Sequence, residues 1–107
     1  MKCKLKISGH VWLESETGLK IGRGRKMLLE KINECGSIAG AAKAINISYR
    51  RAWAMVKEMN RNSEKIIVEK SAGGINGGNA RLTGEGKQII SEFNKLENNF
   101  EKFKSNN

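Results

Sequence analysis

Residues 36–53 read GSIAGAAKAINISYRRAW, and this stretch decides the fold. Small residues come first, a polar turn follows at Asn46, and Ser48 opens a run that contains two adjacent arginines. Ser37 and Ser48 are good helix N-caps, and asparagine tolerates the left-handed backbone of a tight turn. The pattern predicts two helices joined by such a turn. The pair either only packs a core or also presents its arginines to a polyanion.

The spacing within this stretch is that of a helix-turn-helix. Two such helices cross closely, which requires a small residue such as Ala42, four residues before Asn46. The turn then needs an apolar anchor, which Ile47 supplies. The second of the two helices is predicted to run over 48–62.

A wheel drawn at 100° per residue divides the helix over 48–62 into two faces. One arc collects Tyr49, Ala52, Trp53, Val56 and Met59, and the opposite arc collects Arg50, Ala54, Lys57 and Arg61. A basic face with a small residue in its middle suits a DNA major groove. Arginine can bind guanine, the small side chain permits close approach, and later basic residues can hold phosphates. A merely solvated basic face is the alternative.

The segment after this helix has the pattern of a β-hairpin wing. IIVEK (66–70) predicts a strand, residues 71–79 form a loop with four glycines, and residues 81–83 predict the return strand. Lys70, Asn76 and Arg81 are candidates for contacts to phosphates or to the minor groove. A loop that is only flexible is the alternative. A nucleotide-binding loop is disfavoured because no GK[ST] follows.

The first part of the chain predicts a strand and then a helix. Apolar and polar residues alternate over 3–13, which is typical of a half-buried strand, although Trp12 falls on the polar side. A short return strand is expected over 19–21. From 25 to 35 the apolar spacing becomes helical, and Gly36 ends that helix.

The last helix is expected over about 84–104, with Thr83 as its N-cap. Its apolar positions are Ile89, Ile90, Phe93, Leu96, Phe100 and Phe103. Steps of four and three residues are the heptad spacing of a helix that packs along a partner helix. This favours a role in dimerisation, with an internal packing face as the alternative.

The length and the charge of the chain restrict the functions that it can have. The 107 residues suit one domain, and the formal net charge is +9. Residues 20–87 contain fourteen basic and six acidic side chains and therefore carry +8 of this charge. A localised basic excess is typical of phosphate binding and favours a nucleic acid partner.

Other functions find little support in the composition. The chain has one histidine, His10, and no aspartate, which excludes a Ser-His-Asp triad and disfavours a metal site. We expect no enzyme activity and no cofactor. Cys3 and Cys35 are expected to be buried and inert. No long apolar run or signal peptide is present, so we expect a cytoplasmic protein with no membrane partner.

Three segments together resemble a known family. They are LLEKINECGSIAGAAKAINISYRRAW, MN at 59–60, and IIVEKSAGGINGGNARLTGEG. The combination resembles the N-terminal winged helix-turn-helix domain of molybdate-responsive, ModE-type transcriptional regulators, over roughly residues 22–90. LysR-type regulators share the broad architecture, but their recognition helix lacks the SYRRAW pattern.

The resemblance implies a homodimer that binds double-stranded DNA. In the family the recognition helix and wing contact DNA, while the first strand and the last helix help to form the dimer. Carried over by position, the residues on or near DNA would be Ser37, Ser48, Tyr49, Arg50, Arg51 and Lys57. Tyr49 and Trp53 are expected mainly to pack. The full set of candidate DNA-binding residues is Ser37, Ser48, Tyr49, Arg50, Arg51, Ala54, Lys57, Arg61, Lys70, Asn76 and Arg81.

The chain departs from the full-length regulators at its C-terminal side. Those regulators carry molybdate-binding domains, whereas residues 91–107 (SEFNKLENNFEKFKSNN) offer no oxyanion pocket. We therefore expect an α+β, stand-alone winged helix-turn-helix domain over 1–107, with no molybdate site. The protein then acts without the metal signal, or another component supplies it. A winged-helix module that binds proteins and not DNA is the alternative function.

Overall fold

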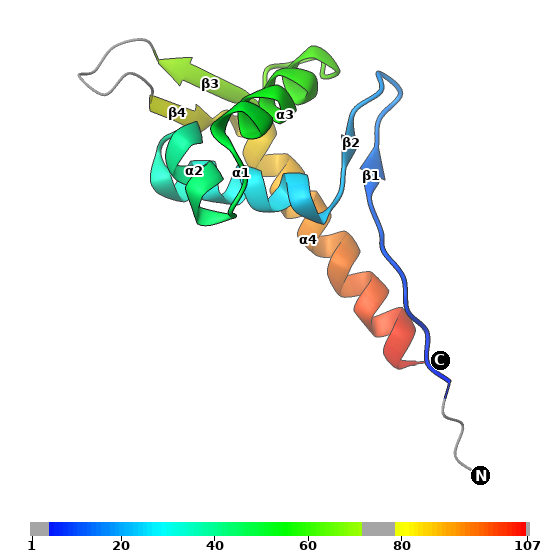
Figure 1. Cartoon of the computed structure of the whole chain (residues 1–107). Helices are drawn as coiled ribbons and strands as arrows, with labels where there is room; N and C mark the ends of the chain where they lie inside the picture. Colours follow the sequence, from blue (N-terminus) through cyan, green and yellow to red (C-terminus); the bar gives the residue numbers. More distant parts are fainter. Residues whose placement is uncertain (1–4, 72–78, 107) are drawn as a thin grey trace.

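The computed structural model describes residues 5–71 and 79–106. The elements, in chain order, are β1 (Leu13–Glu14), β2 (Lys20–Ile21), α1 (Arg23–Cys35), α2 (Ile38–Ala44), α3 (Tyr49–Arg61), β3 (Val68–Ser71), β4 (Asn79–Leu82) and α4 (Gly84–Ser105). Helices α1 to α3 form one group, with a hairpin on each side, and α4 runs from this group toward the chain ends (Figure 1). The predicted α+β class and the order of the helices are confirmed.

The core lies between the three short helices, the β3–β4 hairpin and the first half of α4. The buried face of α2 includes Ala41 and Ala42, and their small side chains allow the helix to approach its neighbours closely. This confirms the reason for a small residue at position 42. The largest fully buried side chains are Phe93, Ile21, Leu28, Leu29, Ile32, Met59, Ile67, Val56 and Val68.

Three helices begin with a hydroxyl cap, as predicted. The side chains of Ser37, Ser48 and Thr83 each accept a hydrogen bond from the backbone N–H three residues ahead, at 2.9, 3.0 and 3.2 Å. Such a bond satisfies an N–H group that has no partner inside the helix. The turns also follow the prediction, because Gly36 and Asn46 have φ angles of 75° and 62°.

The predicted strand over 3–13 is wrong for most of its length. Among the described residues of this segment, only Leu13 belongs to a strand, and it pairs with Ile21. A strand requires a hydrogen-bonded neighbour, and β2 offers only two residues. Residues 9–12 instead line a groove with α4, in which Gly9 lies beside the ring of Phe100.

The two strands predicted after α3 are confirmed as an antiparallel pair, with shifted ends. Strand β3 starts at Val68 and not at residue 66, and β4 starts at Asn79 and not at residue 81. Residues 66 and 67 precede the ladder because the N–H of Ile67 binds the side chain of Asn60. The loop between the strands, residues 72–78, lies outside the described residues, as does the candidate Asn76.

The expectation that Cys35 is buried is wrong, because it is exposed. It lies on the apolar stripe of α1 but in its last turn. There it faces Gly40 of α2, whose missing side chain cannot cover the thiol. Cys3 lies outside the described residues.

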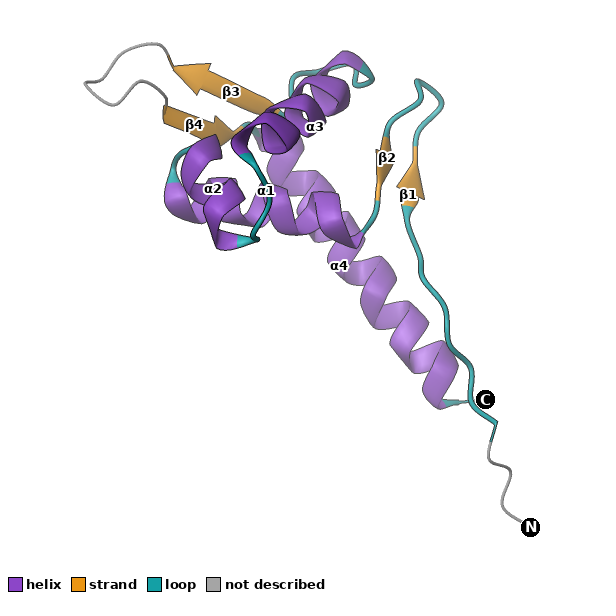
Figure 2. Ribbon diagram, in the orientation of Figure 1, coloured by secondary structure: helices purple, strands orange, loops and turns teal. Residues whose placement is uncertain are grey.

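The apolar stripe of α4 divides into two parts. Phe93 is fully buried, and Ile89, Ile90 and Leu96 pack partly against the core. Phe103 is 54% exposed, at the part of the helix that extends beyond the helical group (Figure 2). The second half of the stripe packs locally instead, because the rings of Phe100 and Phe103 stack with their centroids 6.3 Å apart and Gly9 lies beside Phe100.

Candidate nucleic-acid interface

The outer face of α3 has the arrangement that the helical wheel predicts. Ala52, Val56 and Met59 are buried at 0–1% exposure, and they anchor the helix to the core. The residues on the opposite arc, Arg50, Ala54, Lys57 and Arg61, are all exposed, as is Arg51. The buried face fixes the helix, so the basic face is presented outward on a rigid element.

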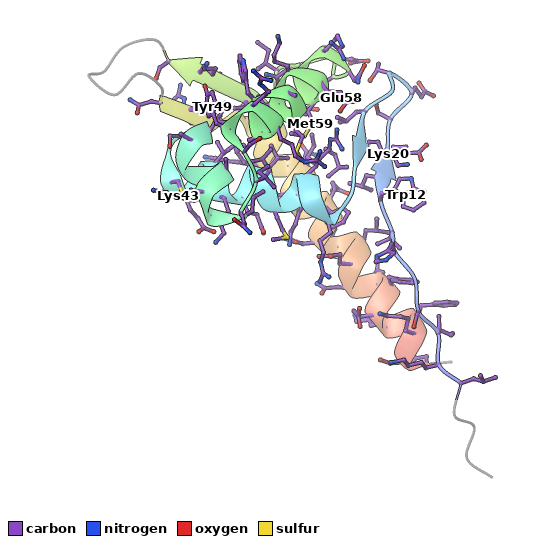
Figure 3. The ribbon with its side chains drawn as sticks, viewed as in Figure 1. Trp12, Lys20, Lys43, Tyr49, Glu58 and Met59 are labelled. Carbon is purple, nitrogen blue, oxygen red and sulfur yellow. The ribbon has the colours of Figure 1, made fainter. Side chains whose placement is uncertain are left out.

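Three further candidates lie at the starts of α2 and α3. Ser37 is partly buried and caps α2, while Ser48 is exposed and caps α3. Trp53 packs partly against the core, as expected, but Tyr49 is 49% exposed. Tyr49 is the first residue of α3, directly after the cap Ser48. The apolar face of the helix is therefore buried only from Ala52 onward. Figure 3 shows it at one end of α3, with Glu58 near the other end.

The two candidates at the base of the wing lie on opposite faces of the hairpin. Lys70 shares a face of β3 with buried Val68, since alternate residues of a strand point the same way. The cross-strand partner of Lys70 is Ala80, which is also buried. Arg81 lies on the other face and pairs with Glu69 at 3.5 Å.

Lys70 lies beside helix α3, at the ring of Trp53. Its Nζ lies 3.9 Å from the ring centroid of Trp53, and the Nζ of Lys57 lies 5.8 Å from the same centroid. The structure therefore brings together two predicted DNA-binding lysines, one from the helix and one from the wing, at an aromatic ring. The sequence placed both lysines in the site but did not show that they meet.

Asn60 connects helix α3 to the start of β3, and the sequence analysis assigned it no role. Its Oδ1 accepts hydrogen bonds from the N–H groups of Ile67 and Val68 at 2.8 and 3.1 Å. Its Nδ2 donates to the carbonyl of Val68 at 3.0 Å. The available signal was an asparagine in the last turn of an amphipathic helix, shortly before a strand.

The C-terminal end of α3, where Asn60 lies, is also held by the β1–β2 hairpin and by α1. The hydroxyl of Thr17 donates to the carbonyl of Asn62, and Arg25 forms an ion pair with Glu58. Figure 3 shows Glu58 on the side of α3 that faces the hairpin carrying Lys20. These contacts and those of Asn60 fix the C-terminal end of α3, which helps to orient its basic face.

The described residues offer neither a metal site nor a membrane-spanning helix. Within residues 5–71 and 79–106, no three histidine, cysteine, aspartate or glutamate side chains gather in a way that could hold a metal. No described helix is both long and apolar enough to cross a membrane.

Comparison of the sequence with those of known proteins shows the family to which the chain is related. MopA of Rhodobacter capsulatus, a molybdenum-pterin-binding protein, is 44% identical over 78 residues, which are 73% of this chain and 29% of MopA. The transcriptional regulator ModE of Yersinia pestis is 43% identical over 72 residues, 67% of this chain and 27% of ModE. The DNA-binding transcriptional dual regulator ModE of Escherichia coli K12 is 44% identical over 72 residues, 67% and 28% of the two chains.

This is a ModE-type domain. The matched part is less than a third of the length of each of these three relatives. No protein-family model matches the chain. The names of these relatives describe two transcriptional regulators and one molybdenum-pterin-binding protein. The resemblance expected from the SYRRAW and wing motifs is confirmed.

Proposed function

We propose that this ModE-type domain binds double-stranded DNA as a homodimeric transcriptional regulator in the cytoplasm. Helix α3 enters the major groove, and the wing contacts the flanking backbone. The observation that supports this best is the outer face of α3, where Arg50, Lys57 and Arg61 are exposed around Ala54 on a helix whose other face is buried. The names of the ModE relatives, which describe transcriptional regulators, support the same reading.

The homodimer is supported by apolar side chains that stay exposed before β1. Leu5 is 86% exposed, and Ile7 and Trp12 are 38% and 47% exposed. The described residues 5–12 run extended without a strand partner, so a second copy can pair with them. A two-fold dimer would place two α3 helices about one helical turn of DNA apart and would read a palindromic site.

The test is fluorescence anisotropy with two duplexes, one random and one from the protein's own promoter region. We expect tighter binding to the promoter and a steep loss of affinity with salt. A dimer that contacts about 6–10 phosphates loses roughly 10³–10⁵ in affinity between about 50 and 200 mM salt. Sedimentation of the same sample should show a dimer at micromolar concentration. Absence of binding to either duplex at low salt would contradict the proposal.

Arg50 and Lys57 are expected to act differently. Arg50→Ala should reduce discrimination between promoter and random DNA by about 1–3 kcal/mol, because a bidentate contact to guanine is lost. Lys57→Ala should weaken binding to both duplexes equally, because a phosphate contact carries no sequence information. Anisotropy titrations of each variant against both duplexes separate the two roles. An equal loss for Arg50→Ala would make it a phosphate contact instead.

A protein-binding module is the second candidate function. Trp12 and Phe103 are 47% and 54% exposed, and such aromatic side chains are common at protein interfaces. This reading predicts no affinity for DNA even at low salt, so the same titration decides between the two. Molybdenum-pterin binding, which the name of MopA describes, does not carry over to this chain, because the match covers only 29% of that relative.

A further inference from the structure

We propose that Trp53 is a positioning residue that holds Lys57 and Lys70 together as a two-cation site for the DNA backbone. The site lies where the recognition helix meets the wing. This inference rests on the proposed function and adds to it the residue that makes helix and wing act as one phosphate-binding surface. Trp53 itself need not touch DNA.

The ring of Trp53 is the element that the two lysines share. Trp53 and Lys57 are four residues apart and therefore neighbours on one side of α3. Lys70 reaches the same ring from β3, with its Nζ 3.9 Å from the centroid, while that of Lys57 is at 5.8 Å. Both distances lie within the range in which an aromatic face attracts a cation. Trp53 also packs partly against the core, so the ring is a fixed platform.

The wing is built to bring Lys70 to this ring. The face of β3 that carries buried Val68 also carries Lys70, opposite buried Ala80. Lys70 therefore lies on the inner face of the hairpin, at the position where this face leaves the core and becomes exposed. Asn60 fixes the start of β3 to α3 through three hydrogen bonds, which sets the distance between strand and ring.

The charges at this junction favour an anionic ligand. Two ammonium groups that converge on one ring repel each other, and the ring offsets only part of that repulsion. Across the described residues, neither Lys57 nor Lys70 forms an ion pair, in contrast to Arg81, which pairs with Glu69. Phosphate groups of a duplex would relieve this repulsion, and the chemistry requires no particular base.

The experiment is a double-mutant cycle of Trp53→Leu and Lys70→Met, read by anisotropy with duplex DNA across a salt series. In the wild-type background, Lys70→Met should weaken binding roughly three- to tenfold and reduce the salt slope by about one. In the Trp53→Leu background the same change should cost less than about twofold, because Lys70 is no longer held. Trp53→Phe, which keeps an aromatic ring, should restore most of the effect of Lys70→Met.

Lys20→Met is the matched control. Lys20 lies 4.5 Å from the ring centroid of Trp12, on the other hairpin, so the change removes one charge from a similar pair outside the proposed site. It should leave the salt slope unchanged.

A purely structural role for Trp53 predicts equal losses for Lys70→Met in both backgrounds. That result, with wild-type binding intact, overturns the positioning role alone. Failure of the wild-type protein to bind any duplex overturns the proposed function and this inference together.

A second measurement covers the case in which Trp53→Leu fails to fold. In a Trp12→Phe protein, Trp53 is the only tryptophan that emits. Addition of duplex should change its emission, because the ammonium groups beside the ring engage phosphates. Lys70→Met should remove more than half of that change. An unaltered response in Lys70→Met would overturn the proposal.

Discussion

The Asn60→Ala variant is expected to unfold with a free energy lower by about 2–4 kcal/mol than that of the wild-type protein. Asn60 makes three hydrogen bonds to the backbone of Ile67 and Val68, two of them to N–H groups. Alanine leaves those groups without partners beside the fully buried side chains of these residues. A partly buried polar group without a partner costs about 1–3 kcal/mol, so the effect exceeds that of an ordinary surface change.

Urea denaturation followed by circular dichroism measures this loss, and Asn62→Ala is its matched control. Asn62 is the same residue type two positions further on, but among the described contacts only its backbone, and not its side chain, forms hydrogen bonds. We expect a change within about 0.5 kcal/mol for the control. Equal stabilities for the two variants would show that Asn60 does not hold the wing strand.

The Gly86→Ala variant is expected to lose about 2–3 kcal/mol of stability, although alanine is ordinarily the better helix residue. A Cβ atom at position 86 would lie 2.6 Å from the carbonyl oxygen of Ile67, and real Cβ atoms do not approach that closely. The oxygen cannot move away easily, because it accepts hydrogen bonds from both the N–H and the hydroxyl of Thr83. The added methyl group therefore displaces α4 from the wing.

Gly84→Ala provides the comparison within the same helical turn. No atom lies within 4 Å of a Cβ built at Gly84, and this residue is exposed. Alanine there should leave stability unchanged or raise it by up to about 1 kcal/mol. Thermal unfolding of both variants tests the pair. A stable Gly86→Ala protein would mean that α4 can shift without cost.

The features that the sequence predicted well depend on local chemistry. A serine or threonine that caps a helix satisfies a backbone N–H three residues away, so the starts of α2, α3 and α4 could be located from Ser37, Ser48 and Thr83 alone. The turn at Asn46 depends on the backbone preference of one residue. The two faces of α3 follow from helical periodicity, since the core takes whichever side is apolar.

The features that the sequence did not predict depend on partners distant in the chain. Alternation over residues 3–13 gave no information on the length of the strand beside it, and β2 is two residues long. The apolar spacing of α1 predicted a buried Cys35, but it gave no sign that the residue facing Cys35 would be a glycine, Gly40. The placement of Lys70 at the ring of Trp53 and of Arg81 beside Glu69 depends on strand register, which loop length and packing decide together.

The bond between the N–H of Ala80 and the carbonyl of Gly36, 2.9 Å long, connects the first turn of the motif to the return strand of the wing. The residues predicted to face DNA fall between these two positions, with the exception of Arg81. The segment therefore leaves and re-enters the remaining scaffold at adjacent points. The segment between Gly36 and Ala80 could therefore be replaced as a unit by the corresponding segment of a relative. The DNA specificity of the relative would then be combined with the α1 and α4 sequences of this protein.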